Sequence, residues 1–262
     1  MPCSKNDLLD PDRIKANLGA SLIGRQVIVF NSTSSTNDIA AEYAANKKNN
    51  GLVIFAEQQT AGRGRAANKW LSDPGQSVLC SVLLTDCPLN PELLSLTAAV
   101  AVAETIGRHA KVKWPNDIFL NGRKTAGILL ESKNYDYGIA YIIGIGINCH
   151  QQEDSFPPQL KSIATSLDIE TGTTCSRISL AKRLLVCLDH RIETAQTDGA
   201  RVIELWRKRS IQIGHRVTLV FDGSRFTGNC IGIDPQKGLI LQLDTGGIRI
   251  FNAAHTTIAH SR

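Results

Sequence analysis

The chain has 262 residues, 42% apolar and 20% charged, which is typical of a folded protein with a sizeable core. No stretch approaches 18 consecutive apolar residues, and the N-terminus lacks the apolar centre of a secretory signal. We therefore expect no membrane span and a cytoplasmic location. The net charge of +5 mildly favours phosphate-bearing ligands, but it does not form the basic stripe of a dedicated nucleic-acid binder.

Cysteine and histidine spacing argues against covalent and metal crosslinks. The seven cysteines are odd in number and lack a CxxC pair, which indicates reduced thiols rather than a disulfide framework. The six histidines show no HxH or HExxH pairing, so we expect no zinc site and no metal held by the protein.

Up to about residue 210, the predicted elements mix strands and helices. Asn90-Pro91-Glu92 marks a helix start, because Asn caps helices and Pro is tolerated at the first helical position. Asn121-Gly122 between two apolar runs predicts a hairpin. In chain order we expect strand 26–30, a helix capped by Ser34 or Ser35 and ending near Asn46, strand 52–57, a buried helix from Asn90 to about Arg108, strands 117–120, 125–131 and 139–147, and helices 177–194 and 199–209, the second capped by Asp198.

From Gln212 onward, short strands recur at intervals of roughly ten residues between Gly and Asp turns, which indicates a small antiparallel barrel. The expected strands are 217–221, 225–233, 238–243 and 247–251. The predicted fold class is α/β (α+β), with a mixed β-sheet domain covered by helices and a small C-terminal SH3-like β-barrel. We divide the chain into an N-terminal extension (1–25), the main domain (26–210) and the barrel (211–262).

A glycine- and arginine-rich loop follows the second predicted strand. In Gly62-Arg63-Gly64-Arg65 the glycines allow the backbone to approach a ligand closely. The arginines offer paired donors suited to carboxylate or phosphate. Such a loop can close over a reactive intermediate and exclude water. A solvated basic turn is the alternative interpretation.

Two further motifs place polar groups beside predicted strands. In Lys113-Trp-Pro-Asn-Asp117, Asn116 and Asp117 offer an amide and a carboxylate to a nucleotide, a metal or an incoming amine. Lys124, with Gly127 three residues on, can direct its ammonium at developing negative charge. A simple Pro-Asn-Asp turn and a surface lysine are the respective alternatives.

The fourth motif, Gly144-Ile-Gly-Ile-Asn148, ends an apolar run. It is not a dinucleotide fingerprint, because Cys149 stands where GxGxxG requires glycine. Two glycines on one face of a strand can instead leave a flat floor for a ligand ring. The alternative is that they only ease packing between strands.

In order and spacing, the four motifs together resemble the biotin–protein ligase family, and the resemblance runs from Ser34-Ser-Thr-Asn37 to the C-terminal barrel. It implies an enzyme that uses ATP with Mg²⁺ to convert biotin to biotinyl-5′-AMP. The biotinyl group would then pass to a lysine of a biotin carboxyl carrier domain of a carboxylase. No covalent enzyme intermediate is needed, which agrees with the lack of a recognisable Ser-His-Asp or Cys-His pattern.

The resemblance also implies roles for individual residues. Ser35, Thr36 and Gln59 would bind the two ends of biotin, and its rings would lie against Gly144 and Gly146. The residues expected to bind biotin or nucleotide are Ser35, Thr36, Asn37, Gln59, Gly62, Arg63, Arg65, Trp70, Lys113, Asn116, Lys124, Gly127, Gly144, Gly146 and Asn148.

Three residues are the expected catalytic groups. Lys124 would contact the biotin carboxylate and later the adenylate, and Arg65 would close over the phosphate. Asp117 would face the arriving carrier lysine. Trp70, Asn116 and Asn148 would serve the adenine nucleotide.

The loop departs from the pattern of repressor-type members, which is close to GRGRRGRKW. Ala66-Ala67-Asn68-Lys69 replaces its middle, so a glycine and two arginines are missing. An Asn two residues before the Trp looks like the loop of eukaryotic members. We expect the adenylate to be held by this altered loop.

Three alternatives stay open. A lipoate or octanoate ligase or transferase shares the broad fold but lacks the KWPND segment. A DNA-binding repressor needs about 60 residues of winged helix-turn-helix, and only some 25 precede Gln26, so we expect no DNA binding. A non-catalytic biotin-binding protein is the third. Exposed strand edges would also permit a homodimer.

Overall fold

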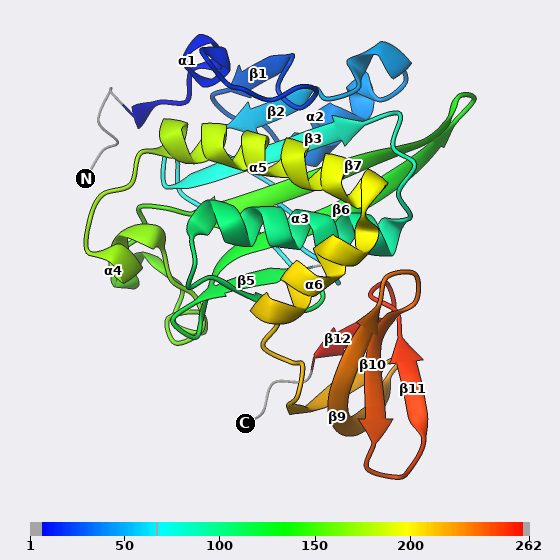
Figure 1. Cartoon of the computed structure of the whole chain (residues 1–262). Coiled ribbons are helices and arrows are strands. Elements are labelled where there is room, and N and C mark those ends of the chain that lie inside the picture. The colour runs from blue at the N-terminus through cyan, green and yellow to red at the C-terminus, as the bar shows by residue number, and fades with distance from the viewer. Residues whose placement is uncertain (1–6, 67, 259–262) are drawn as a thin grey trace.

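The computed structural model describes residues 7–66 and 68–258 and contains two β-sheets (Figure 1). The larger is a seven-stranded mixed sheet with the order β1-β2-β3-β7-β6-β5-β4. Its strands are β1 (Val27–Phe30), β2 (Val53–Ala56), β3 (Ser77–Leu84), β4 (Lys111–Lys113), β5 (Asp117–Leu120), β6 (Arg123–Tyr135) and β7 (Gly138–Asn148). Only the β1–β2 pairing among these strands is parallel.

Helices cover both faces of this sheet. On one face lie the long helices α3 (Pro91–Ile106), α5 (Arg177–Thr197) and α6 (Gly199–Arg209), in front of the strands in Figure 1. On the other, α2 (Thr36–Tyr43) packs through Ala40 and Ala44 against Ile54 and Ile142. Short helices complete the chain: α1 (Pro11–Lys15), η2 (Lys47–Asn49), η3 (Glu153–Ser155) and α4 (Leu167–Thr171).

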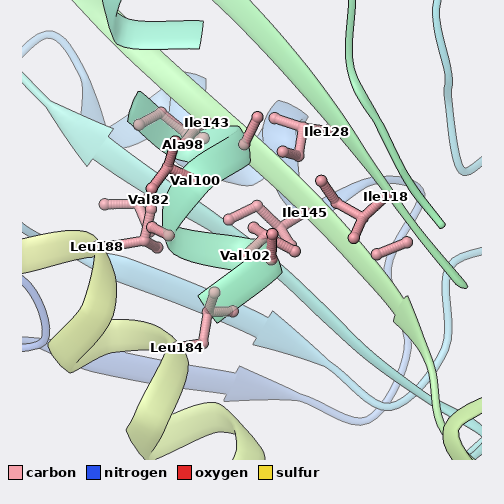
Figure 2. Close-up of a cluster of buried hydrophobic side chains, with 14 of the residues drawn as sticks. Val82, Ala98, Val100, Val102, Ile118, Ile128, Ile143, Ile145, Leu184 and Leu188 are labelled. Atoms are coloured by element: carbon pink, nitrogen blue, oxygen red, sulfur yellow. The ribbon is translucent and has the colours of Figure 1, made fainter. Parts of the chain in front are cut away.

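The main core lies between α3 and the sheet. Figure 2 shows Val100 and Val102 of α3 among strand residues that include Ile143 and Ile145. Leu184 of α5 packs on the same helix from its other side. Small side chains along α3 let it be buried all round, as its Ala- and Val-rich sequence predicted.

Local sequence explains where several helices begin and end. Asn90 accepts a hydrogen bond from Leu93 N (2.9 Å), and Asp198 accepts one from Arg201 N (3.1 Å), so both predicted caps are confirmed. Ser35 is the N-cap of α2. That helix ends at Tyr43 rather than near Asn46, because Asn46 caps the next turn by accepting from Lys48 N (3.0 Å).

The predicted hairpin at Asn121-Gly122 is confirmed. It joins β5 to β6, and both turn residues have positive φ, 49° and 83°. An Asn-Gly pair adopts this backbone at little cost, whereas most residues do not. The turn sets Leu120 opposite Arg123, and a bulge between Ile118 and Phe119 then shifts the pairing by one residue, so that Asp117 lies opposite Gly127.

Several elements were not predicted. The most important is β3, an eight-residue apolar strand that lies between β2 and β7 in the middle of the sheet. Because every one of its residues is buried, it has no polar alternation to mark it as a strand. The other unpredicted elements are α1, η2, η3, α4, the short strand β4 and the last strand, β12 (Thr256–Ile258).

The C-terminal region, predicted as a small barrel, forms a five-stranded antiparallel sheet with the order β11-β10-β9-β8-β12. It contains the four predicted strands, β8 (Arg216–Phe221), β9 (Ser224–Asp234), β10 (Gly238–Leu243) and β11 (Ile248–Phe251). It lies below α6 in Figure 1 and follows that helix directly in the chain. The change from helices to short strands falls close to Ser210, while the division into three domains stays a prediction.

Hydrogen bonds hold the N-terminal segment against α5. The Asp189 carboxylate accepts hydrogen bonds from the backbone N–H groups of Ser21, Leu22 and Ile23 (2.6–3.0 Å). No helix in the part of the chain that the structure describes combines the length and apolar character needed to cross a membrane.

Candidate active site

A cavity of about 140 Å³ lies where the start of α2, the Gly62–Arg65 loop and strands β5 to β7 meet. It gathers most of the predicted site residues in one place: Ser35, Thr36, Asn37, Gln59, Arg63, Arg65, Trp70, Asn116, Asp117, Lys124, Gly127, Gly144 and Gly146. The strands supply the floor, and the loop closes one side. A drug-sized ligand usually needs at least about 300 Å³, so the cavity is partly filled by its own side chains.

One end of the cavity, here called the α2 end, holds a polar cluster of three buried residues, Thr36, Asn37 and Ser81, and the half-buried Gln59. Gln59 Oε1 accepts hydrogen bonds from Thr36 N (2.7 Å) and Thr36 Oγ1 (3.0 Å). The Ser81 hydroxyl, on β3 and fully buried, lies 2.7 Å from Thr36 Oγ1 and 2.5 Å from Asn37 Oδ1. Because these groups satisfy one another, their orientations are fixed before a ligand binds.

Ionic contacts close the rim of the α2 end. Arg63 bonds to Asp38 (2.6 Å) and to Glu131 (3.1 Å), which also accepts from Asn37 Nδ2 (2.5 Å). The hydrogen bond to Asp38, opposed by burial and supported by Glu131, raises the pKa of Arg63. A Cβ on Gly144 would collide with the Asn37 carboxamide, so glycine is required for that close approach.

The loop itself is a tight hairpin. Trp70 N donates to Gly62 O (2.9 Å), and Gly64 N donates to Asn68 O (2.7 Å). A Cβ on Gly62 would lie 2.7 Å from Trp70 O, which explains the glycine. Ala66 has φ 51°, a left-handed conformation that non-glycine residues rarely adopt. Of the predicted Ala66-Ala67-Asn68 departure, Ala67 lies outside the described residues.

Trp70 lies on a floor made of two paired glycines. Gly127 of β6 and Gly146 of β7 are opposite each other in register, and a Cβ on Gly146 would lie 2.5 Å from the indole. The indole Nε1 is buried and has no hydrogen-bond partner. The predicted floor for a ligand ring was Gly144 with Gly146; here the Trp70 indole covers Gly146 together with Gly127, and the Asn37 carboxamide covers Gly144.

Lys124 and Asp117 face each other beside this floor. The Lys124 ammonium lies 2.6 Å from Asp117 Oδ1 and 5.8 Å from the centre of the Trp70 ring. Asn116 directly precedes β5 and is held against β6, because its Nδ2 donates a hydrogen bond to Ile128 O (2.7 Å). An anion that enters here meets an ammonium already paired with a carboxylate.

Arg65 points to the C-terminal sheet. Its guanidinium donates to the carbonyl oxygens of Ala253 and Thr256 (3.3 Å for Thr256). The backbone N–H of Ala253 in turn donates to Glu92 at the start of α3 (3.0 Å). Burial lowers the pKa of Arg65, while Asp117 and Glu92 raise it. We call Arg65, Trp70, Asp117 and Lys124 the loop end of the cavity.

Three predicted residues do not line the cavity. Gly62 forms the base of the loop, and Lys113 lies over the Phe119 ring (5.2 Å to its centre). Asn148 donates to Thr165 O (2.9 Å) and accepts from Gln151. Conversely, no sequence motif indicated Ser81 or Glu131, which bond to residues that line the cavity. The only signal for Ser81 was a single hydroxyl within an apolar run.

Comparison with known proteins shows the class to which this fold and cavity belong. A family model described as the biotin/lipoate A/B protein ligase family matches residues 29–148. This range runs from β1 to the end of β7 and therefore contains every strand of the cavity floor.

Relatives that match most of this chain are named as ligases. The bifunctional ligase/repressor BirA of Bacillus spizizenii is 37% identical over 254 residues, which cover 94% of this chain and 78% of the relative. The biotin–[acetyl-CoA-carboxylase] ligase of Mycobacterium tuberculosis is 33% identical, with 92% and 93% covered. A solved structure of the biotin protein ligase from Aquifex aeolicus in complex with biotin and ATP has a TM-score of 0.77 and 25% identity, with 90% of this chain and 100% of that chain covered. The chain belongs to the biotin–protein ligase family.

Proposed function

We propose that this protein is a biotin–protein ligase that forms biotinyl-5′-AMP from biotin and ATP, then transfers biotin to a lysine of a biotin carboxyl carrier domain. The observation that carries the proposal is the geometry of the cavity. A fixed polar cluster at the α2 end and a cationic loop end share one glycine floor. Such a site can orient a small polar ring and a carboxylate next to a phosphate.

The first step joins the biotin carboxylate to the nucleotide. A carboxylate oxygen attacks the α-phosphorus of ATP, which arrives with Mg²⁺ as part of the substrate, and pyrophosphate leaves. Biotin would be held at the α2 end by Thr36 and Gln59, and Ser81 would orient Thr36 from behind. Lys124 would stabilise the negative charge that grows on the phosphorus and carboxyl oxygens, because its ammonium already points into the cavity.

The second step transfers the acyl group to the carrier. The lysine amine attacks the carbonyl carbon, the bond to AMP breaks, and AMP leaves. The amine must lose a proton from a group whose usual pKa is about 10.4. We assign that role to Asp117, whose carboxylate is released from Lys124 once the ammonium binds the adenylate.

The Trp70 side chain must move away from the glycine floor before both substrates can bind. With the indole against Gly146, the cavity is too small for biotin and nucleotide together. We propose that the indole shifts to stack on the adenine while the loop closes over the phosphate. Arg65 belongs to the same loop, so this movement would also act on its hydrogen bonds to the Ala253 and Thr256 carbonyl oxygens of the C-terminal region.

The decisive experiment is mass spectrometry of a carrier domain incubated with the protein, ATP, Mg²⁺ and biotin. One added biotinyl group per carrier is expected, together with one pyrophosphate released per biotin. A carrier whose target lysine is changed to arginine is the matched control. No mass change in the wild-type carrier, with pyrophosphate absent, would refute the proposal.

Lipoate or octanoate is the alternative substrate, since the matching family model covers both groups of enzymes. The polar cluster of the α2 end favours the ureido ring of biotin, because that ring can exchange further hydrogen bonds with these groups and a long alkyl chain cannot. Calorimetric titration separates the two: we expect binding of biotin and none of octanoate under the same conditions.

The proposal covers ligase activity alone. We do not extend the repressor half of the Bacillus relative's name to this chain. A gel-shift experiment at moderate salt is expected to show no specific DNA complex.

We also propose a cytoplasmic location, where ATP is available. The exposed sheet edges permit a homodimer, and sedimentation analysis tests this oligomeric state.

A further inference from the structure

A second polar cluster lies just past the end of β7, outside the cavity. It contains His150, which follows β7 by two residues, Asp168 of α4, Cys175 before α5, and Asp7 of the N-terminal segment. All four side chains are only partly exposed, at 13% for His150 and Asp168 and 16% for Asp7. None of them takes part in the proposed ligase reaction.

The geometry of this cluster matches a metal-binding set. His150 Nδ1 lies 2.8 Å from Asp168 Oδ2. Ligand atoms of His150, Asp168 and Cys175 all lie within 4.8 Å of one another. A nitrogen, an oxygen and a sulfur ligand are the three donor types that Zn²⁺ accepts in proteins.

Backbone contacts hold the three ligands in place. Asp168 N donates to the carbonyl oxygen of Cys149 (3.0 Å), which ties α4 to the end of β7. Cys175 N donates to Asp168 Oδ1 (2.8 Å), so the thiol is held beside the carboxylate. Between them Gly172, with φ 67°, ends α4 and turns the chain back. The arrangement does not depend on flexible surface side chains.

We propose that His150 Nδ1, the carboxylate of Asp168 and the sulfur of Cys175 form a binding site for a divalent ion of the Zn²⁺ type, with water as the fourth ligand. Asp7 is not a ligand but orients the imidazole of His150. Its Oδ2 lies 3.0 Å from His150 Nε2, so it accepts the second ring N–H and leaves Nδ1 free to bind the ion. Histidine ligands in zinc sites commonly have a carboxylate partner of this kind.

Asp7 is itself held by Arg177. It accepts from Arg177 Nε (2.7 Å) and from Arg177 N (2.9 Å). Arg177 is fully buried and also bonds Glu57 (2.7 Å). The hydrogen-bonding partner of the imidazole is therefore fixed, as a preorganised site requires.

Charge and distance both permit the ion. Two carboxylates, those of Asp168 and Asp7, lie beside the imidazole of His150, so the cluster favours a cation. The ion binds Nδ1 without its proton and the sulfur as a thiolate, so binding releases protons. The His150–Asp168 separation of 2.8 Å would widen to about 3.4 Å, given tetrahedral angles and metal–ligand bonds of about 2.1 Å.

The donor set also selects the class of ion. Mg²⁺ and Ca²⁺ prefer oxygen ligands, whereas imidazole and thiolate favour Zn²⁺, Co²⁺ and similar ions. The site is therefore distinct from the Mg²⁺ that accompanies ATP. A bound ion would tie β7, α4 and the start of α5 together and stabilise the folded chain.

Cobalt titration of the whole protein tests the proposal, with a phosphine as reductant so that no added thiol competes. We expect one Co²⁺ per chain, visible bands of tetrahedral Co²⁺ and a thiolate-to-cobalt charge-transfer band in the near ultraviolet. Zn²⁺ should displace the cobalt without further proton release, and Zn²⁺ added to the metal-free protein should release ligand protons and raise Tm.

Variants make the test specific. Cys175→Ser preserves side-chain size and should abolish the charge-transfer band and the Tm rise, as should His150→Gln. Cys187→Ser, a half-buried cysteine within α5 and outside the cluster, is the matched control and should behave as wild type. Circular dichroism without metal checks that each variant is folded. Failure of the folded wild type to bind one Co²⁺, or an unchanged spectrum in Cys175→Ser, would overturn the proposal.

Discussion

The two ends of the cavity are prepared for ligand to different degrees. At the α2 end, Gln59 and Ser81 already bond to Thr36, and Thr36 and Ser81 are buried. At the loop end, Lys124 is paired with Asp117, and Arg65 is engaged with the C-terminal sheet. Biotin can therefore enter a formed pocket, whereas ATP must displace existing contacts. The difference predicts that biotin binds readily to the free protein and that nucleotide binding requires movement of the loop.

The largest expected effect comes from removing the cation of the loop end. Lys124→Ala should lower the rate of pyrophosphate release by about 10²–10³, the usual cost of losing one electrostatic donor at the reacting atoms. Biotin affinity should change much less. Lys113→Ala is the control, because this lysine lies over Phe119 outside the cavity. Equal losses in both variants would show that the cavity does not define the site.

Arg65→Met should have the next largest effect. It removes the guanidinium that we expect to bind the phosphate after leaving the Ala253 and Thr256 carbonyls, an interaction of about 1.5–3 kcal/mol. We expect KM for ATP to rise roughly 10- to 100-fold, with KM for biotin nearly constant. Steady-state kinetics with each substrate varied in turn measures the split.

Arg63→Met is the matched control for Arg65→Met, because Arg63 bonds to Asp38 and Glu131 at the rim of the α2 end. Its effect should fall on biotin instead. If both variants raised the two KM values alike, the loop would act as a single unit and the two ends would not differ.

Ser81→Ala tests the α2 end. It removes a buried hydroxyl that contacts Thr36 and Asn37, so about 1–2 kcal/mol of binding energy for biotin should be lost, or roughly a tenfold rise in KM. KM for ATP should be unchanged. Ser77→Ala on the same strand is the control, since its hydroxyl contacts Ser72 and Gln151. A nucleotide effect in Ser81→Ala would contradict the separation of the ends.

The smallest expected effect concerns the backbone of the loop. Ala66 has φ 51°, which costs an L-residue about 1 kcal/mol. Ala66→Gly removes this strain and should slow proteolytic cleavage between residues 63 and 69 by up to about fivefold. Limited proteolysis of the free protein measures it. Faster cleavage would mean that the added freedom of glycine outweighs the relief of strain.

Much of this fold follows from local signals. Asn90 and Asp198 cap the helices that they were predicted to cap, and Asn121-Gly122 forms the predicted hairpin. These signals work because a cap or a turn is satisfied within a few residues. In contrast, β3 was missed, since uniform burial removes the alternation that identifies a strand.

The sequence predicted most of the residues that line the cavity, but not the hydrogen bonds that those residues make. Residues of four separate motifs meet in one cavity, yet Arg65 bonds to carbonyls 188 and 191 residues away. No motif specifies such a contact, because it depends on where the second sheet docks. The His150, Asp168 and Cys175 cluster was missed for a similar reason: its members are separated by 18 and 7 residues, which matches no paired metal motif.

The position of Trp70 gives the protein an optical signal of its own. The chain has three tryptophans, and Trp114 and Trp206 are fully enclosed in the core. Only Trp70 lines the cavity, stacked on Gly127 and Gly146 and close to the Lys124 ammonium. Any change in intrinsic fluorescence when nucleotide is added should therefore come from this one indole, so stopped-flow mixing of the unlabelled protein can time its departure from the glycine floor.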